Sequence, residues 1–72
     1  MATRRTPTPL TVREQQVLRA LAIGLTYGQV AAELGVSLNT IRVHVRSIYG
    51  KLAVRSKTAA VVLALRHEWI HP

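Results

Sequence analysis

The sequence contains no cysteine and no phenylalanine, and only three of its 72 residues are acidic. Without cysteine it has no disulfide bonds and no thiolate metal ligands, so a disulfide-stabilised extracellular domain is excluded. The longest apolar run, 59–65, covers seven residues, whereas about 18 are needed to span a bilayer. The basic N-terminus also lacks the apolar run of a signal peptide. We therefore expect an intracellular protein without a membrane segment.

The length leaves room for one small domain, which excludes a multi-domain enzyme. Three histidines and three glutamates are scattered along the chain, and no nucleophile, base and acid converge. We therefore expect no metal, no cofactor and no catalysis. What stands out is a net charge of +7 from ten Lys and Arg residues. Such a charge favours a polyanionic partner: nucleic acid first, an anionic membrane surface second.

Four helices are predicted, each behind a capping side chain. Two capping boxes are formed by Thr11 with Glu14 and by Thr26 with Gln29. The expected helices follow Thr11, Thr26, Ser37 and Ser56, and end at Gly24, at Gly35, near Leu52 and near Arg66 or His67. No period-two alternation occurs. The sequence predicts an all-α fold: a small four-helix domain over residues 10–72, containing a helix-turn-helix. Residues 1–9, with two prolines, are expected to form a flexible basic arm or linker.

The third helix is expected to present one buried and one exposed face. Ile41, Val45, Ile48 and Leu52 share the buried side. The opposite side carries Asn39, Arg42, Val43, Arg46, Ser47 and Gly50. Arginine pairs with guanine and an apolar group contacts the thymine methyl, so we predict base contacts in the DNA major groove by Asn39, Arg42, Val43 and Arg46. Residues 34–67 hold six basic residues and no acid, which favours this interpretation over an ordinary solvated face. Whether Gly50 permits a close approach or is merely tolerated stays open.

Hydroxyl side chains cluster where the second and third helices begin. Thr26, Tyr27, Ser37 and Thr40 lie there, and helix N-termini offer free backbone N–H groups to phosphate oxygens. For Thr26 and Ser37 capping is the primary role, and phosphate contact is an additional one. His44 is expected at the edge of the buried face, as a structural residue or a phosphate neighbour.

The fourth helix has two apolar sides. Ala60, Leu63 and Ala64 lie on one, and Thr58, Val62, Leu65 and Trp69 on the other. A helix of a monomeric domain needs only one apolar side, so the second set is predicted to form a dimer interface with Trp69 as its aromatic anchor. The alternative is that Trp69 folds back onto the core of its own domain.

These motifs resemble the LuxR-type, or GerE-type, helix-turn-helix over about residues 10–70. The resemblance rests on Leu10-Thr11-Val12-Arg13-Glu14, Val17-Leu18, Ala22-Ile23-Gly24, Val30-Ala31, Leu34, residues 37–44, Ile48, Lys51-Leu52, Val54 and Ala60-Val61. It implies a bacterial or phage transcription regulator that binds DNA as a dimer through the fourth helix. It also implies base contacts by Arg42, Val43 and Arg46, and positions near phosphates for Thr40, His44 and Lys51.

The sequence departs from the family pattern at three places. Ser47 stands where the family often has Asn, and we include it among the expected phosphate contacts. Ser56-Lys57 stands where Asn-Arg or Ser-Arg is common. Glu68 replaces a common Gly, which predicts that the fourth helix runs beyond its usual end.

The sequence thus predicts a sequence-specific regulator that binds double-stranded DNA as a two-fold homodimer in the bacterial or phage-host cytoplasm. RNA polymerase or another regulator is a further expected partner. The leading alternative is a protein-interaction module, a small anti-activator that captures a homologous regulator through its fourth helix. A sigma-factor helix-turn-helix and an RNA-binding basic bundle also remain open. Met1 and the short basic arm favour a stand-alone protein over the C-terminal piece of a larger one.

Overall fold

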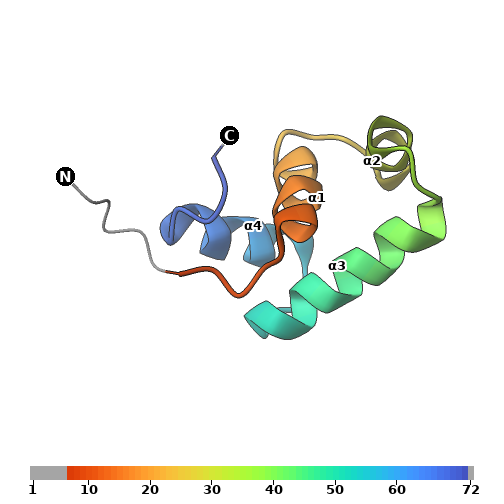
Figure 1. Ribbon diagram of the computed structural model, residues 1–72. Helices are drawn as coiled ribbons and strands as arrows, with labels where there is room; N and C mark the ends of the chain where they lie inside the picture. Colours follow the sequence, from red (N-terminus) through yellow and green to blue (C-terminus); the bar gives the residue numbers. More distant parts are fainter. Residues whose placement is uncertain (1–6, 72) are drawn as a thin grey trace.

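The computed structural model describes residues 7–71, which fold into four helices joined by short loops (Figure 1). The helices are α1 (Val12–Ala22), α2 (Tyr27–Leu34), α3 (Leu38–Leu52) and α4 (Lys57–Arg66). Residues 7–71 contain no strand, and the predicted all-α class with a helix-turn-helix is confirmed. Most of the expected arm, residues 1–6, lies outside the described residues.

All four helix starts lie where the capping side chains predict them. Thr11 and Thr26 each accept a hydrogen bond from the third residue of the helix that follows and close a capping box with it. Ser37 and Ser56 cap α3 and α4 in the same way, without the reciprocal bond. Gly35 ends α2 in the left-handed conformation, with φ of 69°, which glycine adopts without steric cost. Only Val36 then separates this turn from the next cap, so α2 and α3 form a tight helix-turn-helix.

The helices α1 and α3 form the centre of the molecule. Each contacts the other three helices, whereas α2 and α4 do not touch each other and lie at separate ends of the central pair (Figure 1). The buried core draws on every helix and on both flanking segments: Leu10, Val17, Leu18, Leu21, Val30, Ala31, Ile41, Val45, Ile48, Leu52, Ala60, Ala64 and Ile70. Because α3 is packed along one side only, its opposite side faces outward.

The expectation that α4 runs beyond its usual end is wrong. The helix ends at Arg66, and Glu68 takes the left-handed conformation, with φ of 58°, that glycine would adopt there. A non-glycine residue pays about 1–2 kcal/mol for that conformation. Two interactions formed by the turn offset this cost. The Trp69 backbone N–H donates to the Ala64 carbonyl at 2.8 Å, and Ile70 is buried in the core with 3% of its surface exposed. Burying an isoleucine side chain contributes about 1.5–3 kcal/mol.

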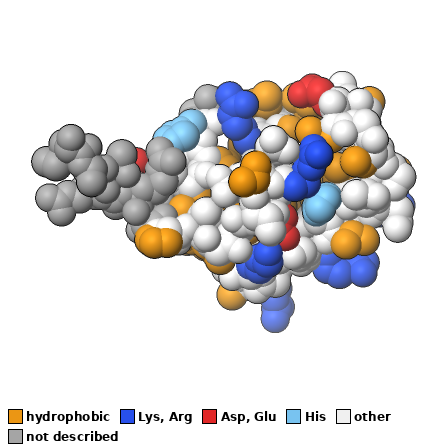
Figure 2. All heavy atoms as spheres, in the orientation of Figure 1, with side chains coloured by type: hydrophobic (Ala, Val, Ile, Leu, Met, Phe, Trp, Pro, Cys, Tyr) orange, Lys and Arg blue, Asp and Glu red, His pale blue; other side chains and the backbone are white. Residues whose placement is uncertain are grey.

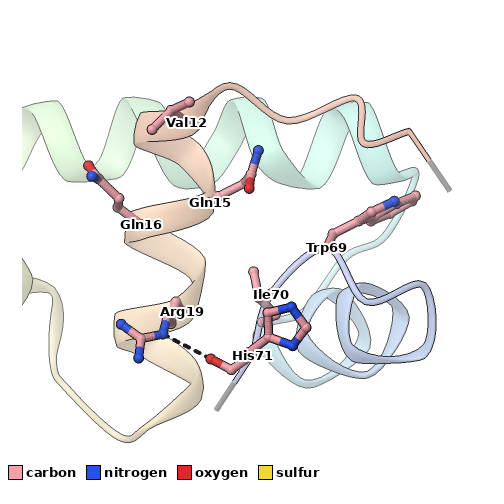
Figure 3. Close-up of a pocket in the computed structure, with 7 residues that line it drawn as sticks. All are labelled: Val12, Gln15, Gln16, Arg19, Trp69, Ile70 and His71. Carbon is pink, nitrogen blue, oxygen red and sulfur yellow. Dashed lines mark hydrogen bonds between the residues drawn. The ribbon is translucent and has the colours of Figure 1, made fainter. Parts of the chain in front are cut away.

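The segment after α4 turns back along α1 (Figure 3). The guanidinium Nε of Arg19 donates to the backbone carbonyl of His71 at 2.9 Å, and Trp69 and Ile70 line a hollow of about 230 Å³ beside α1. Trp69 is half-buried against the core, with its ring stacked on that of His67 at 4.6 Å between centroids. The helical placement of Trp69 beside Val62 is therefore wrong, because the helix ends three residues earlier.

Candidate nucleic-acid interface

The outward side of α3 carries the four residues predicted to contact bases. Asn39, Arg42, Val43 and Arg46 are exposed, and Val43, an apolar side chain, is 54% exposed. Neither arginine pairs with a carboxylate anywhere in residues 7–71. In Figure 2, blue Lys and Arg side chains project from the lower edge of the molecule, where α3 lies. We call the set Asn39, Arg42, Val43 and Arg46 the recognition face.

The hydroxyls at the start of α3 are already engaged with each other. The Ser37 Oγ accepts from the Thr40 backbone N–H at 3.0 Å and lies 2.9 Å from the Thr40 Oγ1. At the start of α2, the Thr26 Oγ1 accepts from the Gln29 N–H at 3.1 Å. The capping roles of Thr26 and Ser37 are confirmed. Thr26 and Ser37 thus mark the starts of α2 and α3, and His44 lies half-buried on the same helix as Thr40.

Glu14 occupies a position that sequence reasoning missed. It lies on α1, is only 4% exposed, and reaches across to α3. Its Oε2 accepts from the Ser47 Oγ at 2.7 Å, and its Oε1 accepts from the Lys51 Nζ at 2.8 Å and from the Thr11 N–H at 2.9 Å. The capping box accounts for only the last of these bonds. Two residues predicted to contact phosphates, Ser47 and Lys51, are thus held by a carboxylate.

The buried carboxylate of Glu14 remains ionised. Burial alone raises its pKa, but the hydrogen bonds from Lys51, Thr11 and Ser47, together with the Lys51 charge, outweigh that effect and lower the pKa from 4.5 to about 2. The negative charge of Glu14 offsets the positive charge of Lys51. The positive potential of α3 therefore comes mainly from Arg42 and Arg46.

Tyr49 is the second residue that sequence reasoning passed over. It lies half-buried on α3, and burial followed by the interaction with the Tyr27 hydroxyl raises its pKa above the ordinary 10.0. Its spacing of three and seven residues from Arg46 and Arg42 places it beside them on the helix, which is the one signal that could have found it. The neighbouring Tyr27 was predicted only from its place at the start of α2.

A second exposed surface lies on α4. Val62 is 48% and Leu65 is 38% exposed, whereas Ala60 and Ala64 on the opposite side are fully buried. Thr58 and Val62 belong to an open hollow of about 440 Å³ that α4 shares with the preceding loop. The burial of Ala60 and Ala64 and the exposure of Val62 and Leu65 agree with the expected sides. Leu63 is half-buried and lines the same hollow as Val62, and Trp69 follows the end of the helix and packs against the core.

Together, the tight α2–α3 turn and the cationic outward side of α3 define a helix-turn-helix domain. A family model described as "Bacterial regulatory proteins, luxR family" matches residues 8–64. The chain belongs to this family of DNA-binding transcription regulators, and its resemblance to the LuxR type is confirmed.

Curated relatives match most of this chain, but the match covers only a small part of their own length. The chain is 47% identical over 57 residues to the nitrate/nitrite response regulator protein NarP of Escherichia coli, covering 79% of this chain and 26% of NarP. It is 46% identical over 54 residues to the probable transcriptional regulatory protein SgaR of Hyphomicrobium methylovorum, covering 75% and 26%. The chain therefore spans about a quarter of the length of these relatives.

Solved structures show the same fold. The structure of the transcription factor GerE aligns with a TM-score of 0.85 at 25% identity, covering 90% of this chain and 97% of that one. The response regulator ChrA of a heme-sensing two-component system aligns with a TM-score of 0.82 at 36% identity, covering 92% of this chain and 33% of ChrA. Among residues 7–71, no helix has the length and apolarity that a bilayer crossing requires.

Proposed function

We propose that this domain reads a specific double-stranded DNA sequence by inserting α3 into the major groove, and that it regulates transcription from that site in the bacterial or phage-host cytoplasm. RNA polymerase or another regulator is the further partner through which it would act. The observation that carries the proposal is the recognition face: two exposed guanidinium groups one turn apart with an exposed valine between them, none of them engaged by the rest of residues 7–71.

The chemistry of the recognition face suits base readout. Each guanidinium can donate two parallel hydrogen bonds to O6 and N7 of guanine, and the Val43 methyl groups can contact a thymine methyl. The helix is 15 residues long, or about 22 Å, and the major groove is about 12 Å wide. Thr26, Tyr27, Ser37 and Thr40 would contact backbone phosphates on either side, with His44 beside them. Ser47 and Lys51 would join these phosphate contacts only if their hydrogen bonds to Glu14 break on DNA binding.

The exposed side of α4 supports association of two copies on DNA. It offers Thr58, Val62 and Leu65 along a helix of ten residues, about 15 Å long. A stable interface buries about 800 Å² from each partner, which these three side chains cannot supply alone. We therefore propose that two domains pair through α4 when adjacent half-sites hold them together, rather than free in solution.

The proposal is tested by selecting bound duplexes from a random pool at two salt concentrations. We expect a recovered palindrome, since two-fold dimers read two half-sites. The matched control replaces Arg42 and Arg46 together by lysine, which keeps both charges but removes the bidentate fork. This variant should still retain duplexes at low salt and yield no consensus. If the parent also yields none, sequence-specific binding is refuted; a consensus with a single unpaired half-site would refute the dimer.

A further inference from the structure

A hollow borders the recognition face and has no role in the base and phosphate contacts proposed above. It lies between the start of α2 and the middle of α3, has a volume of about 390 Å³, and is lined by Tyr27, Arg42, Val45, Arg46 and Tyr49. Val45 is 5% exposed and belongs to the core, so it closes the hollow from below. The other four side chains each bring a hydrogen-bond donor, and no carboxylate lines the hollow.

The two tyrosines together retain a donor for an outside group. The pKa of Tyr49 is raised above its ordinary value of 10.0, first by burial and then by the Tyr27 hydroxyl, so the Tyr49 hydroxyl keeps its proton at neutral pH. Two hydroxyls carry two hydrogens, and an interaction between them uses only one. In the part of the chain that the structure describes, no other group accepts from either hydroxyl. One O–H therefore remains to be donated into the hollow.

The composition of the hollow selects an anion with several acceptor oxygens. Two guanidinium groups supply positive charge and N–H donors, and the tyrosine pair supplies a neutral donor that carries no charge. A phosphodiester has oxygens that only accept, and it is present at every step of the duplex that the recognition face would meet. Arg42 and Arg46 can attract it and still extend their outer N–H groups towards bases.

We propose that Tyr49 and Tyr27 together bind one backbone phosphate of the DNA at the rim of the major groove, in the hollow bounded by Arg42 and Arg46. This assignment rests on the proposed function, and it adds Tyr49 to the binding residues. Tyr27 lies at the start of α2, where free backbone N–H groups also point outward, so it is the residue nearer to the phosphate. Tyr49 lines the same hollow and completes the donor set.

The experiment uses the selected duplex with one uncharged methylphosphonate at each backbone position in turn. It compares the parent with Tyr27→Phe, Tyr49→Phe and the double variant, after thermal unfolding has shown that each folds. We expect each single variant to bind the unmodified duplex about five- to tenfold more weakly, as for the loss of one hydrogen bond. At one backbone position, the methylphosphonate should weaken the parent but add little to the loss in either variant.

Two further readouts test whether the two hydroxyls act together as one uncharged contact. Because a neutral hydroxyl displaces no counterion, the salt dependence of binding should keep its slope in both phenylalanine variants, whereas Arg42→Ala should lower it. The losses of the two single variants should not add in the double variant. The assignment would be overturned if Tyr49→Phe bound the duplex as tightly as the parent. It would also be overturned if the loss of affinity in the phenylalanine variants added fully to the loss from a methylphosphonate at every backbone position. Failure of the parent to bind any duplex would instead refute the proposed function on which it rests.

Discussion

The ion pair between Glu14 and Lys51 predicts how the stability of the domain depends on pH. The folded pKa of Glu14 is about 2 and its ordinary value is 4.5. At about 1.4 kcal/mol for each unit of pKa difference, the lowered pKa corresponds to about 3 kcal/mol of folding free energy. Domains have about 0.05–0.15 kcal/mol of stability per residue, so 72 residues have about 4–11 kcal/mol. One carboxylate thus supplies a large fraction of the total.

The sign follows from which state holds the proton. Because the folded pKa is lowered, the contribution is fully present above pH 4.5 and is lost as the pH falls towards 2. At pH 3 an unfolded glutamate is almost fully protonated while the folded one is still ionised, so about 2 kcal/mol should already be lost. Urea unfolding followed by circular dichroism at pH 7 and pH 3 measures this loss directly.

Two variants test the assignment to Glu14. Glu14→Gln should lower stability by about 2 kcal/mol at pH 7, because a buried charged hydrogen bond is lost, and its stability should barely change between pH 7 and pH 3. Glu33→Gln, at an exposed position of α2, should keep the pH dependence of the parent. A parent whose unfolding midpoint is the same at both pH values would refute the reasoning, as would a Glu14→Gln variant that retains the full acid loss.

Other predictions concern DNA binding, association and a strained turn. Arg42→Ala and Arg46→Ala should each cost about 1–3 kcal/mol on the cognate duplex and relax its sequence preference in a competition assay; an equal loss on all duplexes would make these residues phosphate contacts. Lys51→Ala should lower the slope of log affinity against log salt by clearly less than the roughly one unit expected for an unpaired lysine, because Glu14 already offsets the charge of Lys51. A decrease of a full unit would mean that Lys51 leaves Glu14 and contacts the DNA. Leu65→Arg should weaken binding to a paired site more than to a single half-site in gel-shift titrations, and equal losses would remove α4 from the interface. Ala53 ends α3 in the left-handed conformation, with φ of 55°, so Ala53→Gly should raise stability by about 1 kcal/mol in urea unfolding, and a lower stability would contradict that account.

The helices and their ends could be predicted from the sequence because their signals are local. A capping side chain, the residue three positions later and an apolar spacing of three or four lie within one or two turns of each other. Thr11, Thr26, Ser37 and Ser56 therefore marked all four starts, and the buried side of α3 was identified residue by residue. The recognition face followed as its complement. Its exposure is observed, and its contacts with bases stay predictions.

The end of α4 shows where local signals fail. Glu68 stands where the family commonly has glycine. Because a non-glycine residue disfavours the left-handed turn, this position predicts a longer helix. The burial of Ile70 against distant parts of the chain, and the bond from Arg19 on α1 to the His71 carbonyl, decide otherwise. Both contacts depend on residues that are distant in the sequence, such as Arg19 on α1. The residues around position 68 therefore contain no signal for them.

The sequence by itself thus determined the four helices, their caps and the outward cationic side of α3, since each is encoded within about two helical turns. Only the tertiary structure decided which charges remain available there. Glu14 meets Ser47 and Lys51 across 33 and 37 residues of chain, and Tyr27 meets Tyr49 between two helices. Such pairs arise from how α1 and α2 pack against α3. The net charge of +7 therefore pointed to a polyanion. Within residues 7–71, the packing of the helices pairs Lys51 with Glu14 and leaves Arg42 and Arg46 as the unpaired cations of α3.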